Sequence, residues 1–453
     1  ENLRTELQQV ETQIRQTSPR YAALTQPQPL TLAEIQTQAL DADTLLLEYA
    51  LGKDRSYLWL VTTTAIKSYE LPKRTEIEAA AREFYLSVSQ SPQASANDVT
   101  AKREIGSTLR QQAQARSEQA AARLSRMLLA PAATLLGKKR LLIVADGALQ
   151  FVPFAALPEL SSEGGGAKPP LIVEHEIVSL PSASTLAVLK RKAGEHKATT
   201  KTLAVLADPV FERADERFKT HASQPDAHIN MLNTLEDKSR DLGVIAEKSA
   251  RESGLAEMDL RIPRLPATRR EADAISALAP PHARLKVLDF AANRGAATDP
   301  ALADYRFVHF ATHGFINSQH PELSGIMFSM FNEQGQAQDG FLRTHEVFNL
   351  KLNADVVVLS ACQTGLGKEV KGEGLVGLTR GFMYAGVPRV VVSLWSVNDE
   401  VTAELMTRFY KGMLTDKLRP AQALQAAQAS MLREPRYSAP FYWAAFTLQG
   451  EWR

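Results

Sequence analysis

The most informative stretch of this chain is Val356-Val-Val-Leu-Ser-Ala-Cys362-Gln-Thr-Gly365, where an unbroken apolar run leads into a cysteine and a glycine turn. Such runs of β-branched residues are typical of strands that are buried on both faces of a sheet. An earlier segment, Phe307–Gly314, has the same plan and brings His313 to a glycine. The two segments therefore predict buried strands that each end in a chemically useful side chain.

Strands and helices alternate around these two segments. We expect strands near 202–208, 285–290, 307–312, 356–361, 389–395 and 443–448, with helices near 268–278, 373–385, 399–414 and 420–433. Thr268 and Glu271 have the spacing of a capping box at the start of the first of these helices. The alternation predicts an α/β fold with a mostly parallel sheet flanked by helices, in which reactive groups gather at the carboxyl ends of the strands.

The first part of the chain predicts a separate α/β unit. Its expected elements are a hairpin, two helices, two strands and a helix, at Thr44–Ala50 with Tyr57–Thr63, then 76–90, 102–129, Arg140–Ala145, Glu176–Leu180 and Ser182–Lys190. Residues 212–262 are polar and charged without a sustained period, which indicates a long mobile insertion. We expect a short N-terminal helix at 1–25, a first unit at 26–198, and a second unit at 199–453 that contains the insertion.

Cys362 and His313 have the chemistry of a nucleophile and its general base. A free thiol has a pKa of ~8.5 and is mostly protonated at neutral pH, so a histidine in hydrogen-bond reach can take its proton. The amide groups of Gly314 and Cys362 lie at turns, where they can stabilise a developing oxyanion. A lone cysteine or histidine is more often structural. Here both residues end apolar strands and precede a glycine, and this joint pattern favours a catalytic pair. We interpret His309, four residues earlier, as a histidine of the core.

Composition excludes several classes of partner and compartment. The chain has 453 residues with 52 basic and 51 acidic side chains, which gives no reason to expect nucleic acid or a membrane surface as a partner. The single cysteine excludes an internal disulfide. No apolar run approaches the about 20 residues that span a bilayer. The chain begins at Glu1, so we expect a piece of a longer cytoplasmic protein, with any targeting signal outside it.

Two rival sites are weaker on the sequence. Gly372-Glu-Gly374-Leu-Val-Gly377 imitates a dinucleotide fingerprint, but it begins ten residues after Cys362 rather than at a strand end, and Glu373 would repel a pyrophosphate. One cysteine and scattered histidines do not give zinc-ligand spacing, and no EF-hand pattern is present. We therefore expect neither a cofactor nor a metal.

Several motifs together resemble a known family. They are His309-Phe-Ala-Thr-His313-Gly, Asp339–Leu350, Val357–Gly365, Gly372–Phe382, Ser393-Leu-Trp395, the terminal Trp443-Ala-Ala-Phe, and upstream Asp146-Gly-Ala-Leu, Pro153–Leu157, Leu180–Ser184 and Leu265–Ala272. From about residue 40 onwards the chain resembles the CHAT domain, the caspase-like peptidase module usually joined to TPR repeats in bacteria. The resemblance implies a caspase-type fold with His313 and Cys362 as its dyad. It also implies a first unit that is a pseudo-caspase half without a dyad, as in separases, and an N-terminal helix that ends a TPR array.

A weaker part of the resemblance concerns substrate choice. Leu394-Trp-Ser-Val-Asn-Asp399 is similar to the separase segment whose last aspartate receives a P1 arginine, and a carboxylate there would select Arg or Lys. Asp399 also opens a predicted helix, so it can equally be a first-turn acid or N-cap. With a basic P1 preference, Arg213, Arg217 and the other basic residues of the insertion 212–262 become candidates for self-cleavage.

Three functions remain open at this point. The first is a cysteine endopeptidase that cleaves a protein substrate and is regulated by an upstream TPR region or its ligand. The second is a scaffold that keeps the fold for protein–protein interaction without catalysis. The third is a nucleotide-binding regulator, which depends on the glycine-rich segment 372–377.

Overall fold

The computed structural model describes residues 29–90, 103–160, 169–218, 262–315, 324–360, 376–395 and 399–453. The expected N-terminal helix 1–25, Cys362 and most of the glycine-rich segment 372–377 lie outside these ranges. So does most of the insertion 212–262. In the described ranges, no helix is both long and apolar enough to cross a membrane.

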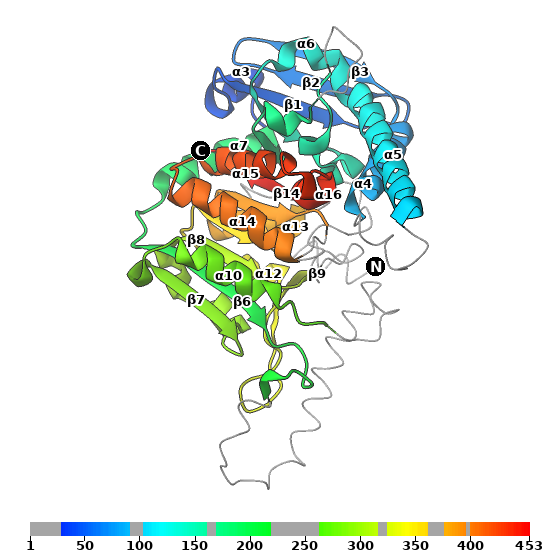
Figure 1. The fold of residues 1–453 in the computed structure, drawn as a ribbon. Coiled ribbons are helices and arrows are strands. Elements are labelled where there is room, and N and C mark those ends of the chain that lie inside the picture. Colours follow the sequence, from blue (N-terminus) through cyan, green and yellow to red (C-terminus); the bar gives the residue numbers. More distant parts are fainter. Residues whose placement is uncertain are drawn as a thin grey trace, which may run out of the picture.

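One large sheet runs through the molecule (Figure 1). The first half contributes β1 Thr44–Ala50, β2 Ser56–Val61, β3 Ile66–Leu71, β4 Arg140–Val144 and β5 Ile177–Leu180. The second half contributes β6 Lys201–Pro209, β7 Arg284–Asp289, β8 Tyr305–Ala311, β12 Val356–Leu359, β13 Arg389–Ser393 and β14 Phe446–Gly450. The strand order is β3-β2-β1-β4-β5-β14-β13-β12-β8-β6-β7. The predicted α/β fold with a mostly parallel sheet is confirmed, and antiparallel pairing is confined to β1–β2, β2–β3 and β13–β14.

The two halves meet where β5 pairs in parallel with β14. Val178 lies opposite Leu448, and both side chains are fully buried. A second contact joins helix α4 (Arg74–Ser89) to the end of β13: Tyr85 donates its hydroxyl hydrogen to the Leu394 carbonyl oxygen at 2.9 Å. The first half is therefore bonded directly to the strand ends of the second.

Helices cover both faces of the sheet. Figure 1 shows α10, α14 and α15 along one face of the second half. The opposite face of β8 is covered by α13, where Phe310 packs against Phe382. The helices are α3 Leu32–Glu34, α4 Arg74–Ser89, α5 Arg103–Leu129, α6 Ala133–Leu136, α7 Ala183–Glu195, α10 Ala267–Ala277, α11 Arg294–Ala297, α12 Thr344–Val347, α13 Val376–Ala385, α14 Asp399–Leu414, α15 Pro420–Leu432 and α16 Pro440–Trp443. This double cover explains why β12 and β13 are buried along their whole length.

A small second sheet was not predicted. It consists of β9 Gly314–Phe315, β10 Gly325–Met327 and β11 Phe341–Arg343, in the order β11-β10-β9. Its first strand begins directly after His313, so this sheet borders the predicted site.

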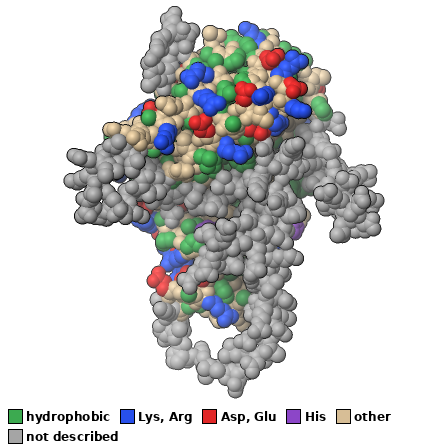
Figure 2. All heavy atoms as spheres, turned by 90° about the vertical axis from the view of Figure 1, so that its right-hand side faces the viewer, with side chains coloured by type: hydrophobic (Ala, Val, Ile, Leu, Met, Phe, Trp, Pro, Cys, Tyr) green, Lys and Arg blue, Asp and Glu red, His purple; other side chains and the backbone are tan. Residues whose placement is uncertain are grey.

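The surface of the molecule carries both signs of charge. Figure 2 shows basic and acidic side chains interspersed on the upper part of the face in view, in keeping with the near balance of charge in the sequence.

Candidate active site

His313 lies two residues beyond the end of β8, at the carboxyl edge of the large sheet. Its Nε2 is 2.8 Å from the Pro263 carbonyl oxygen, and its ring centroid is 5.0 Å from that of Phe211. A carbonyl oxygen can only accept, so Nε2 carries the proton and the lone pair of the neutral ring is on Nδ1. Burial lowers the pKa of His313, and the hydrogen bond to Pro263 opposes this only in part. The imidazole is thus a neutral base at neutral pH, with Nδ1 as its basic atom.

Gly314 directs its N–H group away from the small sheet. The Met327 N–H donates to the His313 carbonyl oxygen at 2.9 Å, and the next pair along this antiparallel ladder is Ile326 with Gly314. In such ladders, hydrogen-bonded pairs alternate with pairs whose N–H and C=O groups point away from the partner strand. Because β9 ends the strand order of the small sheet, the Gly314 N–H faces its open side.

The ladder between β8 and β12 has a constant offset. Val356 pairs with Phe307 and Leu359 pairs with Phe310, so the partners are 49 residues apart in sequence. The Ser360 N–H donates to the Phe310 carbonyl oxygen at 2.9 Å, and this bond completes the last named pair, Leu359 with Phe310. Cys362, two residues further, lies outside the described residues.

Asp399 is the first residue of α14, as the sequence predicted for the start of this helix. Its side chain is outside the described part of the structure. The segment before it leaves β13 through Leu394 and Trp395, and Trp395 is held by several contacts. The Trp395 indole N–H donates to the Phe441 carbonyl oxygen at 3.1 Å, and the Tyr85 ring meets its edge with centroids 6.0 Å apart.

His309 is fully buried, as its interpretation as a core histidine predicts. Its Nε2 lies 3.0 Å from Glu271 Oε1, and its Nδ1 lies 3.2 Å from the Tyr410 hydroxyl oxygen. Neither Nε2 nor Oε1 makes an aligned hydrogen bond, so this is a charge contact. We assign the ring proton to Nε2, the nitrogen that faces the carboxylate, which leaves Nδ1 to accept from Tyr410. Burial, together with the negative charge of Glu271, raises the pKa of Tyr410 well above its ordinary value, so its O–H remains a donor. This buried triad joins α10, β8 and α14.

The predicted capping box at Thr268 and Glu271 is wrong. Helix α10 begins at Ala267 after Pro266, and the cap has no side-chain hydrogen bond. Thr268 instead donates to the Leu265 carbonyl oxygen at 2.7 Å and accepts the Asp208 N–H at 3.1 Å. The Glu271 side chain is instead buried against His309, so it does not reach back to the start of the helix.

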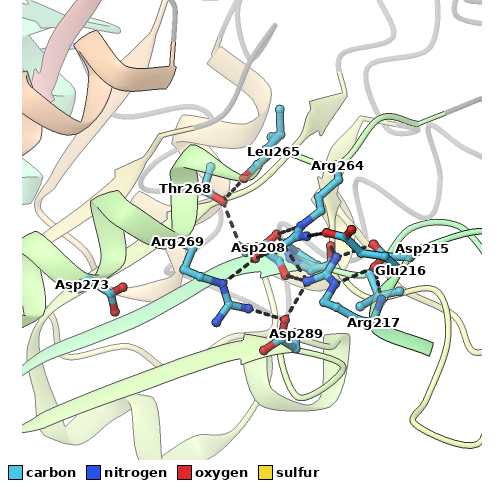
Figure 3. A network of polar contacts seen from close by, with 12 residues as sticks. Asp208, Asp215, Glu216, Arg217, Arg264, Leu265, Thr268, Arg269, Asp273 and Asp289 are labelled. Carbon is cyan, nitrogen blue, oxygen red and sulfur yellow. Dashed lines mark hydrogen bonds and ion pairs between the residues drawn. The ribbon is translucent and has the colours of Figure 1, made fainter. Parts of the chain in front are cut away.

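A network of aspartates and arginines lies at the carboxyl ends of β6 and β7, beside Pro263 (Figure 3). We call it the Asp208 network, and its members are Asp208, Asp215, Glu216, Arg217, Arg264, Arg269 and Asp289. Sequence reasoning did not identify it, although an aspartate at the end of each of two predicted strands was a signal. The expectation that Arg217 belongs to a mobile insertion is wrong, because its side chain is only 11% exposed and bonded to three aspartates. Arg213 lies over the Phe331 ring, 5.7 Å from its centroid.

Among the described residues, no group of three or more metal-ligating side chains is arranged to hold an ion. Of the glycine-rich segment 372–377, Val376 and Gly377 are described, and they form the start of α13. The sequence argument against a nucleotide site there therefore remains a prediction.

Comparisons with known proteins identify what this architecture is similar to. A family model described as "CHAT domain" matches residues 118–451. Tetratricopeptide repeat protein 28 of Mus musculus is 35% identical over 109 residues, which are 24% of this chain and 4% of that protein. The Homo sapiens protein of the same name is 24% identical over 320 residues, or 69% of this chain and 12% of that protein.

A solved structure has the same fold at low sequence identity. The separase in the Saccharomyces cerevisiae separase–securin complex aligns with a TM-score of 0.55 and 10% identity, over 96% of this chain and 31% of that one. The expected resemblance to caspase-like peptidases is thereby confirmed at the level of the fold. This chain spans a small part of the length of each of these relatives.

Proposed function

The chain belongs to the CHAT domain family, and from this premise we propose that it is a cysteine endopeptidase with Cys362 as nucleophile and His313 as general base. The fold is that of caspase-like cysteine peptidases, and the wider family includes members without catalysis. The question for this chain is therefore whether its own residues make a working dyad.

The observation that carries the proposal is the offset of the ladder between β8 and β12. Its partners are 49 residues apart, and so are His313 and Cys362. Residues in register on neighbouring parallel strands lie about 4.8 Å apart and project to the same face. A chain that follows this offset past Leu359 would reach the carboxyl edge of the sheet, where His313 follows the end of β8. The strands would then deliver the thiol and the imidazole side by side.

The described geometry supports a defined sequence of proton transfers. His313 Nδ1 takes the proton of the Cys362 thiol, and the sulfur attacks the carbonyl carbon of the scissile peptide. The Gly314 N–H, on the open side of β9, would stabilise the oxyanion together with the Cys362 N–H. The C–N bond then breaks as Nδ1–H protonates the leaving amine, giving an acyl-enzyme. Water, deprotonated by His313, hydrolyses the thioester and regenerates the thiol.

The test is cleavage of a denatured peptide library, read by mass spectrometry of new termini. We expect new termini with the wild-type chain and none with Cys362→Ser or His313→Gln. Arg306→Gln is the control, because Arg306 pairs with Asp355 near the amino end of β8, away from the site. Cleavage that persists in Cys362→Ser would end the dyad hypothesis. An intact wild-type chain that cleaves nothing, with a thiol as unreactive as in His313→Gln, would favour the scaffold function instead.

We further propose that Asp399 selects a basic P1 residue. In support, Asp399 opens α14, the next helix after β13, and β13 neighbours β12 in the sheet. The start of α14 therefore follows the same carboxyl edge as His313. Asp399→Ala should abolish cleavage after Arg and Lys, while iodoacetamide still alkylates Cys362 at the wild-type rate. Unchanged cleavage after Arg would remove Asp399 from the pocket.

The insertion 212–262 remains a proposed self-cleavage site, apart from Arg217, whose side chain is engaged in the Asp208 network. Its other basic residues except Arg213 lie outside the described ranges. Incubation of the wild type beside Cys362→Ala tests the idea, and identical fragment patterns would exclude self-processing.

The proposed regulator is an upstream TPR region, with residues 1–25 as the end of its array. The support is that the curated relatives are named tetratricopeptide repeat proteins and are far longer than this chain. Residues 26–198 would be a pseudo-caspase half, since they contain no cysteine. A longer protein that includes the upstream region should respond to a ligand of that region with a changed cleavage rate. A response equal to that of the 453-residue chain would argue against this form of regulation.

A further inference from the structure

Asp208 is the centre of the Asp208 network. It is fully buried near the end of β6 and has a φ of +48°, in the left-handed region that residues other than glycine adopt only under constraint. Arg264 donates to the Asp208 carboxylate from Nε at 2.9 Å and from Nη2 at 2.8 Å. Arg269 Nε donates to the same carboxylate at 2.9 Å. Arg217 Nη1 donates to the Asp208 carbonyl oxygen at 2.7 Å. The buried charge is thus compensated from several directions (Figure 3).

Asp289 repeats this geometry on the neighbouring strand. It ends β7 with a φ of +55° and accepts hydrogen bonds from Arg217 and Arg269. Burial would raise the pKa of Asp289, but the hydrogen bonds from Arg269 and Arg217 lower it below the ordinary value. The register between β6 and β7 shifts at Asp208, which is a bulge of the kind that redirects a side chain. Two strand ends therefore turn towards the same arginines.

One peptide bond and one hydrogen bond connect this network to the imidazole. Arg264 directly follows Pro263, whose carbonyl oxygen accepts the His313 Nε2–H. On the other side of Arg264, Leu265 is tied through Thr268 to the Asp208 N–H. Asp208 therefore holds residues 263–265 twice, by its carboxylate through Arg264 and by its backbone through Thr268.

We propose that Asp208 and Arg264 are positioning residues for His313. The bidentate ion pair between them fixes the Pro263 carbonyl oxygen, and this acceptor keeps the imidazole proton on Nε2 and the lone pair on Nδ1. The inference rests on the proposed dyad. It gives the Arg264 side chain a role beyond stabilising the surface, because a shift of the Arg264 backbone moves the Pro263 carbonyl oxygen that accepts the His313 Nε2–H. Lys at this position keeps the charge but lacks the fork that defines the geometry.

Two arginines of the Asp208 network allow a matched comparison of variants. Arg264 and Arg269 both donate to Asp208, but only Arg264 adjoins Pro263, since Arg269 lies on α10. A purely structural network predicts similar effects for Arg264→Gln and Arg269→Gln. A positioning role predicts that both variants lose stability and that only Arg264→Gln changes the chemistry of the dyad.

Alkylation of the thiol measures that chemistry without a known substrate. Cys362 is the single cysteine of the chain, so the rate of its reaction with iodoacetamide between pH 5 and 10 reports one thiol. For the wild type we expect a reactive thiolate well below pH 8.5, which His313→Ala removes. Arg264→Gln and Asp208→Asn should lower the rate about tenfold at pH values below the pKa of the thiol, the change in thiolate fraction when that pKa rises by one unit. Arg264→Lys should be intermediate, and Arg269→Gln and the remote Arg306→Gln should keep the wild-type profile.

Imidazole nitrogen shifts provide the second readout. In ¹⁵N-histidine-labelled protein, the His313 signals are assigned by their loss in His313→Ala. We expect the neutral wild-type ring to be Nε2–H, and a mixture of tautomers in Arg264→Gln. Arg264→Gln with a wild-type pH profile and tautomer would overturn the positioning role, even with lower stability. A wild-type thiol that is indifferent to His313→Ala would instead overturn the dyad itself, so the two failures are distinguishable.

Discussion

Replacing Tyr410 by phenylalanine tests the buried triad of Glu271, His309 and Tyr410. The change keeps the ring and removes one hydroxyl from a fully buried site. His309 Nδ1 then loses its donor, 3.2 Å away, in a place that water does not reach. An unsatisfied buried acceptor costs about 1–3 kcal/mol, so we expect the free energy of unfolding to fall by about 2 kcal/mol.

The size of the chain dictates the assay. Unfolding entropy is about 2.1 cal/mol/K per residue, or roughly 950 cal/mol/K for 453 residues, so 2 kcal/mol lowers Tm by only about 2 °C. Urea titration resolves this difference better, as a shift of midpoint at constant slope. Tyr57→Phe is the control, because Tyr57 is half-buried and stacks on Trp59, and we expect it to stay within about 0.5 kcal/mol of the wild type.

A double-mutant cycle tests whether the triad acts as one unit. Glu271→Gln keeps a side-chain oxygen of the same size beside His309 Nε2, so we expect a smaller loss of stability than for Tyr410→Phe. Because both groups fix the same ring, the two losses should differ from additivity by at least about 0.5 kcal/mol. If Tyr410→Phe costs no more than Tyr57→Phe, Nδ1 is not the acceptor and the assigned tautomer of His309 is wrong.

Two further predictions concern the ends of the sheet. Burial would raise the pKa of Asp355, but the neighbouring His196, 3.9 Å away, and the hydrogen bond from Arg306 hold the pKa at about 2. The stabilisation from Asp355 is therefore present above pH 3.8 and lost as the pH falls towards 2. The full shift corresponds to about 2.4 kcal/mol, and solvent screening of a carboxylate one third exposed reduces this to about 1 kcal/mol. In urea titrations, Asp355→Asn should therefore lose correspondingly less stability than the wild type between pH 5 and pH 2. Tyr85→Phe removes the hydrogen bond to the Leu394 carbonyl oxygen, and we expect a KM for Arg peptides raised about three- to tenfold with an unchanged rate of thiol alkylation. An unchanged KM would show that the first half does not position the segment after β13.

The large sheet could be predicted from the sequence because its strands are long and apolar. Val356–Leu359 and Arg389–Ser393 are buried along their whole length, and unbroken β-branched runs have few alternatives to such burial. Strand β3, Ile66–Leu71, was missed because its residues are mostly exposed and carry no apolar alternation. The small sheet was missed because strands of two or three residues are too short for any periodicity.

The parts of the site that depend on distant residues could not be predicted. The spacing of His313 and Cys362 was visible, but a sequence does not show that the ladder between their strands has the same offset. Arg264 finds its partner Asp208 only after the chain returns across residues 219–261. The capping-box pattern at Thr268 misled because local hydrogen-bond rules omit competing buried partners, here the Asp208 N–H.

The junction between β5 and β14 has a consequence for dividing the chain. If residues 26–198 were produced alone, β5 would become the open edge of a five-stranded sheet, with Val178 and Leu180 uncovered. The complementary piece would expose β14, whose Leu448 is equally apolar. Unprotected apolar edges of this kind recruit other strands. Each half thus covers the edge strand of the other and prevents its self-association. We expect either half to aggregate when it is produced alone and to stay soluble when both are produced together.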